Sequence, residues 1–211
     1  MVALTLPFPT PERARLTPLA PARTWLTDTG FIDHQRALVR DTEPLFELLR
    51  NSAQWRSERR TMYDRVVDVP RLLGRLPDST PPVLRQLRER LDAYYRVTLD
   101  RVHLARYRDG HDSVAWHGDR IGIHRPWSVI AILSLGGTRR FLVRPAGGGP
   151  SQRFDIGSGD LLVMAGDLQQ THEHCVPKQA HAQPRIAVMF RHSQRWTVDP
   201  TQLAQQRRVL R

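Results

Sequence analysis

The sequence has little cysteine and no long hydrophobic run, and each absence excludes a class of protein. Cys175 is the single cysteine among 211 residues, so no internal disulfide can form, which is typical of the reducing cytoplasm. The longest apolar runs, in residues 128–135 and 160–165, are far shorter than the roughly 20 residues of a membrane-spanning helix. The N-terminus lacks the cationic start and apolar stretch of a secretory signal. We therefore expect a soluble cytoplasmic protein with no membrane partner.

Lysine is almost absent as well. Lys178 is the only one, and the other 31 of the 32 basic residues are arginine. A codon bias would explain the choice of arginine over lysine, but not the excess of 32 basic over 21 acidic residues, which gives a net charge of +11. Such a charge predicts a polyanionic partner, most commonly nucleic acid. Charge alone does not separate a nucleic-acid-binding module from an enzyme that acts on nucleic acid.

The N-terminal half is predicted to be an arm followed by helices. Residues 1–23 are rich in proline and alanine, show no usable period and are expected to form a flexible arm. Apolar residues at helical spacing predict helices in 33–53 and, more clearly, in 81–98, with 55–73 between them matching neither period. The apolar faces are Leu38, Leu45, Phe46, Leu48 and Leu49 in the first helix and Leu84, Leu87, Leu91 and Tyr95 in the second.

Short β-rich segments replace the helical pattern beyond residue 100. Six of them, separated by glycine, proline and aspartate turns, predict an antiparallel sandwich or barrel. The predicted fold is therefore mainly β with N-terminal helices (α+β). The segments are 102–108, 128–135, 139–145, 152–157, 160–165 and 185–191.

A histidine and an aspartate two residues apart, His117 and Asp119, indicate part of a metal site. Imidazole and carboxylate ligands that leave other positions open suit non-haem Fe(II). A third ligand would come from further along the chain, where His172, His174 and His181 are candidates. His172 and His174 would share one face of a strand, so periodicity does not choose between them. Any one of these histidines could instead be a solvated or capping residue.

Arg185 and Arg191 lie six residues apart in a β-rich segment. The even spacing turns both guanidinium groups to the face where buried residues are expected, and two inward arginines need anions. A dicarboxylate that chelates iron with one end and meets arginine with the other would satisfy them, because the guanidinium fork matches a carboxylate. A pair of salt bridges at a strand edge is the alternative.

The order of these motifs resembles the AlkB family of Fe(II)- and 2-oxoglutarate-dependent dioxygenases. The resemblance covers residues 101–191 through ARYRDGHDSVAWHGD, LSLGGTRRFLVRP, GDLLVM, HCVP and PRIAVMFR, and it is weaker over 55–63. It implies a double-stranded β-helix (jelly-roll) core, with Fe(II) as cofactor and 2-oxoglutarate and O₂ as co-substrates. It also implies one dioxygenase domain at 24–198, with helices and a substrate lid in 24–100 and the β-helix core in 101–198. A basic C-terminal tail would follow at 199–211.

The resemblance also implies the ligand set. The family's H-x-D motif falls on His117 and Asp119, and its distal histidine, which precedes a short apolar-proline step, falls on His174. These three residues would hold the catalytic iron. Cys175 should point to the opposite face of a strand from His174 and belong to the core.

For 2-oxoglutarate, the family's arginine pair falls on Arg185 and Arg191 and its tyrosine on Tyr107. Arg185, helped by the Tyr107 hydroxyl, would bind the far carboxylate, and Arg191 would lie nearer the metal end. The chain departs from the pattern where polar residues are replaced, so the co-substrate site has lost polar contacts. These replacements are Ala105, Ala187 and Met189.

In the family, a segment ahead of the β-core covers the flipped base, and QWRSERRTMYD resembles it. Trp55 and Tyr63 would offer stacking faces for an extruded base, and Arg59 and Arg60 would neutralise phosphates. Trp55 could equally be a core anchor beneath the sheet. Two further substrate candidates are Arg120, near the place of a base-contacting acid in some members, and Arg139, which could line the opposite rim or merely be solvated.

The predicted function is oxidative N-dealkylation of damaged nucleic-acid bases, a DNA repair activity that releases formaldehyde, succinate and CO₂. The partner would be alkylated DNA or RNA, single-stranded or with a flipped base, and the protein a monomer. One alternative keeps the chemistry but takes a small metabolite or a modified RNA, which Arg120, Ile121 and Ala187 favour. Another is a nucleic-acid-binding jelly-roll without catalysis, which has no need of the intact metal and arginine motifs.

Overall fold

The computed structural model describes residues 14–62, 65–76, 80–119 and 127–192. Its strands are β1 (Arg15–Leu16), β2 (Ala22–Trp25), β3 (Phe31–Gln35), β4 (Val39–Arg40), β5 (Gln54–Met62), β6 (Arg65–Arg75), β7 (Arg101–Tyr107), β8 (Val114–His117), β9 (Ser128–Gly136), β10 (Arg139–Pro145), β11 (Gln152–Ile156), β12 (Leu161–Gly166), β13 (His172–Val176) and β14 (Arg185–Arg191). The helices are α1 (Glu43–Ser52), α2 (Pro82–Tyr95) and α4 (Leu168–Thr171). No helix within these ranges is long and apolar enough to cross a membrane.

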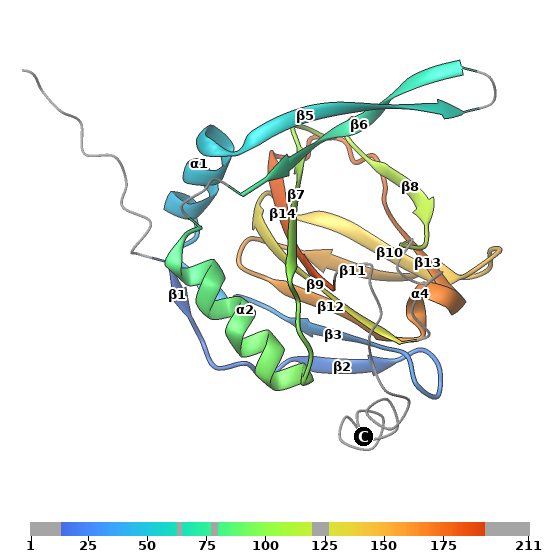
Figure 1. Ribbon diagram of the computed structural model, residues 1–211. Coiled ribbons are helices and arrows are strands. Elements are labelled where there is room, and N and C mark those ends of the chain that lie inside the picture. Colours follow the sequence, from blue (N-terminus) through green and yellow to red (C-terminus); the bar gives the residue numbers. More distant parts are fainter. Residues whose placement is uncertain (1–13, 63–64, 77–79, 120–126, 193–211) are drawn as a thin grey trace, which may run out of the picture.

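Two antiparallel sheets form the body of the protein (Figure 1). The large sheet has the order β2-β3-β12-β9-β14-β7-β6-β5, and the small sheet has the order β11-β10-β13-β8. The six segments predicted as strands beyond residue 100 correspond to β7, β9, β10, β11, β12 and β14, so that prediction is confirmed. The mainly-β fold class is confirmed as well, and the two facing sheets have the arrangement of a double-stranded β-helix.

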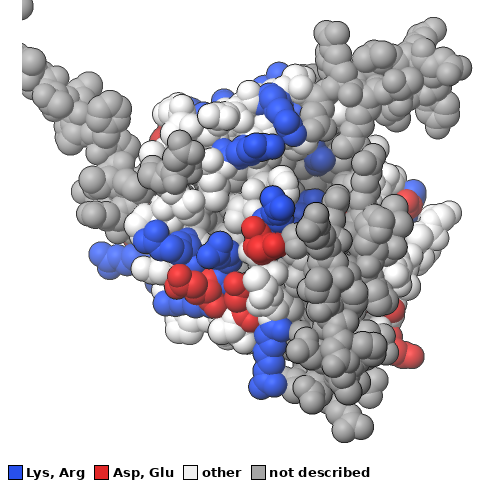
Figure 2. Space-filling model, in the orientation of Figure 1, with Lys and Arg blue, Asp and Glu red and all other residues white. Residues whose placement is uncertain are grey.

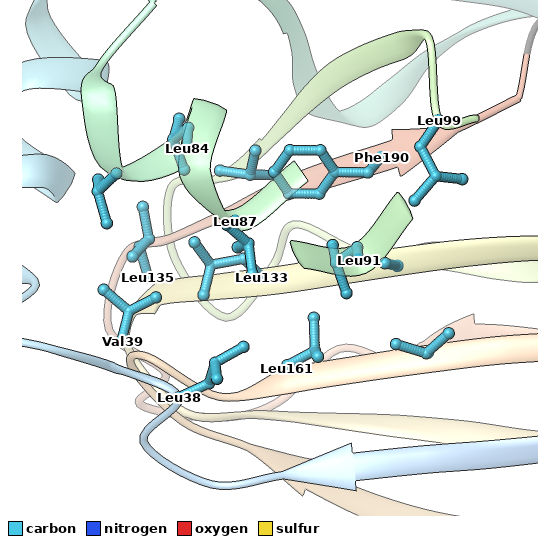
Figure 3. Packing of buried hydrophobic residues seen from close by; sticks show 14 of the residues in the cluster. Leu38, Val39, Leu84, Leu87, Leu91, Leu99, Leu133, Leu135, Leu161 and Phe190 are labelled. Atoms are coloured by element: carbon cyan, nitrogen blue, oxygen red, sulfur yellow. The ribbon is translucent and has the colours of Figure 1, made fainter. Parts of the chain in front are cut away.

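Strand β9 shows why the large sheet is apolar on both faces. Side chains alternate between the two faces of a strand. Leu133 and Leu135 therefore pack on the helix side, in one core cluster with Leu84 and Leu87 of α2 (Figure 3). Ile130 and Ile132 point to the other face and belong to a second cluster, to which both sheets contribute side chains. Helices α1 and α2 cover the outer face of the large sheet, and its inner face is left for the site.

The predicted helix at 33–53 is correct only for its second half. Helix α1 begins at Glu43, and β3 and β4 occupy 31–35 and 39–40 instead. Ala37 and Asp41 have positive φ angles of 48° and 55°, a left-handed conformation that interrupts a helix. Leu38 is fully buried in the core, but it reaches this position from a turn between strands.

The prediction of a flexible arm at residues 1–23 is wrong for residues 14–23, which the structure describes. From residue 14 onward the chain is ordered, with β1 pairing with β4 and β2 with β3. Arg23 donates through two nitrogens to the fully buried carboxylate of Asp33, at 2.7 Å each, and the Tyr95 hydroxyl of α2 donates to the same group at 2.8 Å. Residues 1–13, and the predicted tail at 199–211, lie outside the described ranges.

The segment 24–100 was also expected to be mainly helical apart from the lid, and this is wrong. It contains α1 and α2, but its lid region is a two-stranded ribbon of β5 and β6 that continues the edge of the large sheet beyond β7. The helix predicted at 81–98 is confirmed as α2.

Candidate metal centre and arginine site

Three potential metal ligands come together between the two sheets. His117 ends β8 and lies directly opposite His174 of β13 in the antiparallel register. Asp119 follows β8 by two residues. One nitrogen or carboxylate oxygen from each residue lies within 4.8 Å of the other two, so a single ion could contact all three. Strand pairing thus brings together two histidines that are 57 positions apart in the sequence.

Neighbouring groups orient each ligand. The Nδ1 of His117 lies 2.9 Å from the Ala115 carbonyl, and since a carbonyl only accepts, Nδ1 carries the proton and Nε2 keeps its lone pair for a metal. The Asp119 amide donates to the side-chain oxygen of Gln169 at 2.9 Å. The His174 ring stacks on Phe141 with centroids 5.3 Å apart. These contacts hold two neutral imidazoles and one carboxylate toward a common point.

The charge states suit a metal. Burial lowers the pKa of His174 to about 3, and burial also lowers the pKa of His117, so both rings are neutral at pH 7. Burial acts to raise the pKa of Asp119, but the nearby Arg191 guanidinium and the two imidazoles lower it on balance. The carboxylate is therefore ionised. Metal ligands must be deprotonated in this way, and no proton has to be displaced here.

One buried carboxylate oxygen of Asp119 has lone pairs available to bind a cation. Asp119 Oδ2 makes no hydrogen bond to the described residues, although a guanidinium nitrogen of Arg191 lies 3.3 Å away. Two histidines and a carboxylate on one side of an ion are the donor set of non-haem Fe(II). The residues present therefore fit iron.

The other histidine candidates and the cysteine do not join this group. His172 points its Nδ1 at the Thr171 hydroxyl, 2.9 Å away, and His181 is exposed. The choice of His174 is confirmed by its position in the cluster. Cys175 is buried, and burial raises the pKa of its thiol to about 11, so it stays protonated and belongs to the core as predicted.

The two arginines lie at opposite ends of the site. Arg185, 1% exposed, is directly opposite Tyr107 in the β14–β7 register, its guanidinium 5.3 Å from the Tyr107 ring centre. Its Nε donates to the Ser134 hydroxyl at 2.7 Å. Arg191 approaches Asp119, with a guanidinium nitrogen 3.3 Å from its carboxylate, and so lies at the end of the site that holds the metal ligands. Ala105 and Ala187, which replace polar residues of the AlkB pattern, face each other across the same two strands and are buried.

The sequence matches the family model of the 2OG-Fe(II) oxygenase superfamily over residues 22–208. The chain belongs to this superfamily. With the histidine–aspartate–histidine cluster, membership implies Fe(II) and 2-oxoglutarate, as predicted.

Similar proteins confirm the AlkB resemblance. The oxygenase is 30% identical over 186 residues to human Alpha-ketoglutarate-dependent dioxygenase alkB homolog 3, a match over 77% of this chain and 63% of that protein. It is 33% identical over 142 residues to DNA oxidative demethylase ALKBH2 of Arabidopsis thaliana, over 54% of this chain and 44% of that one. The chain thus spans only part of these relatives. The structure of OsALKBH1 matches with a TM-score of 0.56 at 15% identity, over 82% of this chain and 100% of that one, which supports the fold.

Two substrate candidates of the oxygenase lie elsewhere than predicted. Trp55 is half-buried against the outer core, and its indole nitrogen donates to the Arg50 carbonyl at 3.0 Å, so it is the core anchor and not a base-stacking residue. Arg139 is 1% exposed and donates to the backbone carbonyls of Asp109, Asp112 and Pro177. Arg139 thus links these three backbone segments in the interior and does not line the rim of a substrate site.

For the remaining substrate candidates, the structure describes either the backbone position alone or nothing. Arg59 and Arg60 lie in β5, opposite Asp68 and Val67 of β6. Tyr63 and Arg120 fall outside the described ranges.

Sequence reasoning missed a residue of the site, Arg71 of β6. Its guanidinium donates to the Tyr107 hydroxyl at 3.3 Å. The sequence does not distinguish Arg71 from the other arginines of this segment, because the strand that aims it inward has no regular apolar alternation. Ser134 and Gln169, which hold Arg185 and Asp119, were also missed, and no sequence signal marks them.

Acidification should destabilise the metal-free oxygenase. A histidine in the unfolded chain titrates near 6.5, whereas burial lowers the pKa of folded His174 to about 3. Between these values the unfolded chain binds a proton that the folded protein does not. The free energy of unfolding should therefore fall as the pH drops from about 6.5 toward 3, by about 1 kcal/mol per pH unit for this group.

Urea unfolding of chelator-treated protein at several pH values measures this slope. His174→Gln should flatten it, whereas His111→Gln, at a residue with a 93% exposed side chain, should leave it unchanged. Equal slopes in the wild type and His174→Gln would contradict a neutral, buried His174.

Proposed function

We propose that this oxygenase removes N-methyl groups from nucleic-acid bases by oxidation. In the overall reaction, the methylated base, 2-oxoglutarate and O₂ give the base with an N–H, formaldehyde, succinate and CO₂. The methyl carbon is oxidised and leaves as formaldehyde, while 2-oxoglutarate supplies two electrons and loses its C1 carboxylate as CO₂. Fe(II), when bound, supplies the chemistry that activates O₂ for this oxidation.

The position of the arginine-rich β5–β6 ribbon carries the proposal. Strand β6 pairs with β7, the strand that holds Tyr107, so the ribbon extends the sheet edge beside the site. The Ser113 amide, just ahead of β8, donates to the Pro70 carbonyl of β6 at 2.7 Å, which ties the ribbon to the strand that ends in His117. In Figure 1 the ribbon projects on the same side as β8. Six of its residues are arginines: Arg56, Arg59, Arg60, Arg65, Arg71 and Arg75.

The charge of the molecule supports a polyanionic substrate. The sequence carries a net charge of +11, and in Figure 2 basic groups outnumber acidic ones on the face shown, with blue atoms over the base of the ribbon and both blue and red atoms over α2. Phosphates of a nucleic-acid strand would neutralise the ribbon while a base reaches the metal. Two relatives point the same way: one is named a DNA oxidative demethylase, the other an alkB homolog dioxygenase.

Three groups of residues would have separate roles in this reaction. His117, Asp119 and His174 would hold the iron on one side and leave positions open for 2-oxoglutarate and O₂. Arg185 and Tyr107 would bind the far carboxylate of 2-oxoglutarate. The wall between the sheets is apolar, which excludes water from the reacting atoms; it includes Ile132, Phe141, Met164 and Met189.

Removing charge from the ribbon should weaken binding to nucleic acid. Each phosphate contact contributes about 0.7 to the slope of log affinity against log salt on a single strand. The double variant Arg59→Gln/Arg60→Gln should therefore lower the magnitude of the slope by about 1.4 if both side chains contact phosphate. Fluorescence anisotropy with an N-methylated oligonucleotide over a salt series measures it.

A matched control changes the same charge at a distant edge. Arg36 and Arg40 are exposed and flank the turn between β3 and β4. Arg36→Gln/Arg40→Gln should keep the wild-type slope. Weak binding that does not depend on salt, with no effect of either double variant, would move the assignment to a small-metabolite substrate.

A cytoplasmic location and a monomeric state complete the proposal. They rest on the single cysteine and the excess of charge in the sequence, and sedimentation of the purified protein would test the second.

A further inference from the structure

Arg71 brings a third guanidinium into the site, from the ribbon and not from the β-core. The β6–β7 register pairs Leu72 with Arg106 and Leu73 with Ala105, so Arg71 comes next, beside Tyr107. Its hydrogen bond to the Tyr107 hydroxyl, at 3.3 Å, confirms that its side chain points inward. Tyr107 therefore contacts Arg71 of β6 and Arg185 of β14.

A β-bulge aims this side chain. Between β5 and β6 the register shifts, so that the three residues 69–71 of β6 stand opposite the single residue 58 of β5. Pro70 lies within the bulge, where a missing amide proton costs no ladder hydrogen bond. Bulges redirect side chains and are frequent beside active sites. The bulge thus turns one half-buried arginine of the basic ribbon toward Tyr107 and the site.

The site has more positive charge than its own carboxylate can balance. Arg71, Arg185 and Arg191 contribute three guanidinium groups, and Asp119 is the carboxylate that approaches one of them, Arg191. Arg185 bonds to a serine hydroxyl, and the buried Nε of Arg71 has no hydrogen-bond partner among the described residues. A buried cation without an anion is costly. Iron would add two positive charges, so a dianion is needed to approach balance.

The inner face of the β7–β14 pair supplies no side-chain donor for that dianion at Ala105 and Ala187, next to Tyr107 and Arg185. Ala105 and Ala187 face each other on β7 and β14 and present methyl groups. Donors must therefore come from arginines at the ends of the wall, and Arg71 has donors to spare. Its hydrogen bond to Tyr107, whose ring lies 5.3 Å from the Arg185 guanidinium, places it at the same end of the site as Arg185.

We propose that Arg71 binds the far carboxylate of 2-oxoglutarate together with Arg185, with the Tyr107 hydroxyl between the two guanidinium groups. Because Arg71 belongs to β6, binding of 2-oxoglutarate then fixes the base of the ribbon. The co-substrate thereby stabilises the strand pair that we propose meets nucleic acid. The inference rests on the co-substrate of the superfamily and is independent of the proposed nucleic-acid substrate.

The test measures binding of two acids to the protein loaded with Mn(II), which stands in for iron and avoids turnover. 2-Oxoglutarate has both carboxylates, and 2-oxovalerate has the same carbon chain without the far one. A charge-assisted hydrogen bond contributes enough that Arg71→Gln should weaken 2-oxoglutarate binding by about 10- to 100-fold. The same variant should change 2-oxovalerate binding by less than about 3-fold, within the weak effect of a distant charge. Calorimetry gives both constants.

Two further variants keep the result interpretable. Arg75→Gln removes the same charge from an exposed position of β6 and should leave both affinities unchanged. Arg71→Lys, which keeps the charge but loses the fork, should bind 2-oxoglutarate with intermediate affinity and serves as the test if Arg71→Gln does not fold. Wild-type affinity of Arg71→Gln or Arg71→Lys for 2-oxoglutarate, or an equal loss for both acids, would overturn the proposal.

Hydrogen exchange provides a readout of the ribbon itself. Amides of β5 and β6 in the Mn(II)-loaded wild type should exchange more slowly after 2-oxoglutarate is added, and in Arg71→Gln they should not respond. Nucleic acid is absent from both experiments, so a negative result here would leave the demethylase proposal standing, and failure of that proposal would leave Arg71 in place.

Discussion

Asp119→Ala should abolish 2-oxoglutarate turnover while leaving the fold intact. Asp119 is the one anionic member of the ligand cluster, and its carboxylate also lies 3.3 Å from a guanidinium nitrogen of Arg191. Without it, two neutral imidazoles would have to hold Fe(II) beside a guanidinium. A bound metal contributes several kcal/mol to the reaction, so succinate formation should fall on the order of 10³-fold or more.

The fold should tolerate this change, because Asp119 Oδ2 makes no hydrogen bond to the described residues. Calorimetry with Mn(II) should show loss of metal binding, and circular dichroism an unchanged spectrum. Asp109→Ala removes an equal charge from a side chain that is 60% exposed and should behave like the wild type. If Asp119→Ala kept a tenth of wild-type turnover, Asp119 would not be a ligand.

Arg185→Leu should remove the response to 2-oxoglutarate without destabilising the unliganded protein. Arg185 is 1% exposed, and burial lowers its pKa. Replacing a buried charge that lacks a carboxylate partner by an apolar side chain is often neutral or stabilising. The far carboxylate of the co-substrate, however, would lose a bidentate partner, and its affinity should fall by about 100-fold.

Thermal unfolding of Mn(II)-loaded protein displays both effects. A ligand at 100 times its dissociation constant stabilises the folded state by about 2.7 kcal/mol, which raises Tm by about 5–10 °C in a protein of this size. The wild type and Arg153→Leu, an exposed arginine on β11, should show this shift. Arg185→Leu should not. A full shift in Arg185→Leu would place the far carboxylate elsewhere.

Six strands of the β-core could be predicted because each has an apolar face, whereas the short strands β8 and β13, which carry the histidine ligands, were not among the predicted segments. Strand β9 is buried on both sides and appears in the sequence as the continuous run SVIAILSL. In contrast, 33–53 was assigned to one helix because Leu38 and Leu45 match helical spacing. Left-handed residues at positions 37 and 41, neither of them glycine, break that segment into strands and a shorter helix, and residue type alone did not mark them.

The metal ligands were predictable because they depend on sequence order and residue type, and the resemblance selected His174 among three histidines. The side-chain directions in the lid were harder to predict, because a shift of one residue in register turns a side chain to the other face. The bulge in β6 changes that register beside Arg71. Trp55 packs against the outer core, opposite Gly74, where an added Cβ would lie 2.7 Å from its ring.

Counting products on a methylated strand tests the central claim most directly. The purified oxygenase would be supplied with Fe(II), 2-oxoglutarate, O₂ and a panel of N-methylated oligonucleotides, with the matching free nucleosides and Asp119→Ala as controls. We predict one succinate and one formaldehyde for each methyl group lost from an oligonucleotide, with much slower turnover of free nucleosides and none in the variant. Succinate release that no methylated oligonucleotide stimulates, or that free nucleosides stimulate equally, would contradict the account.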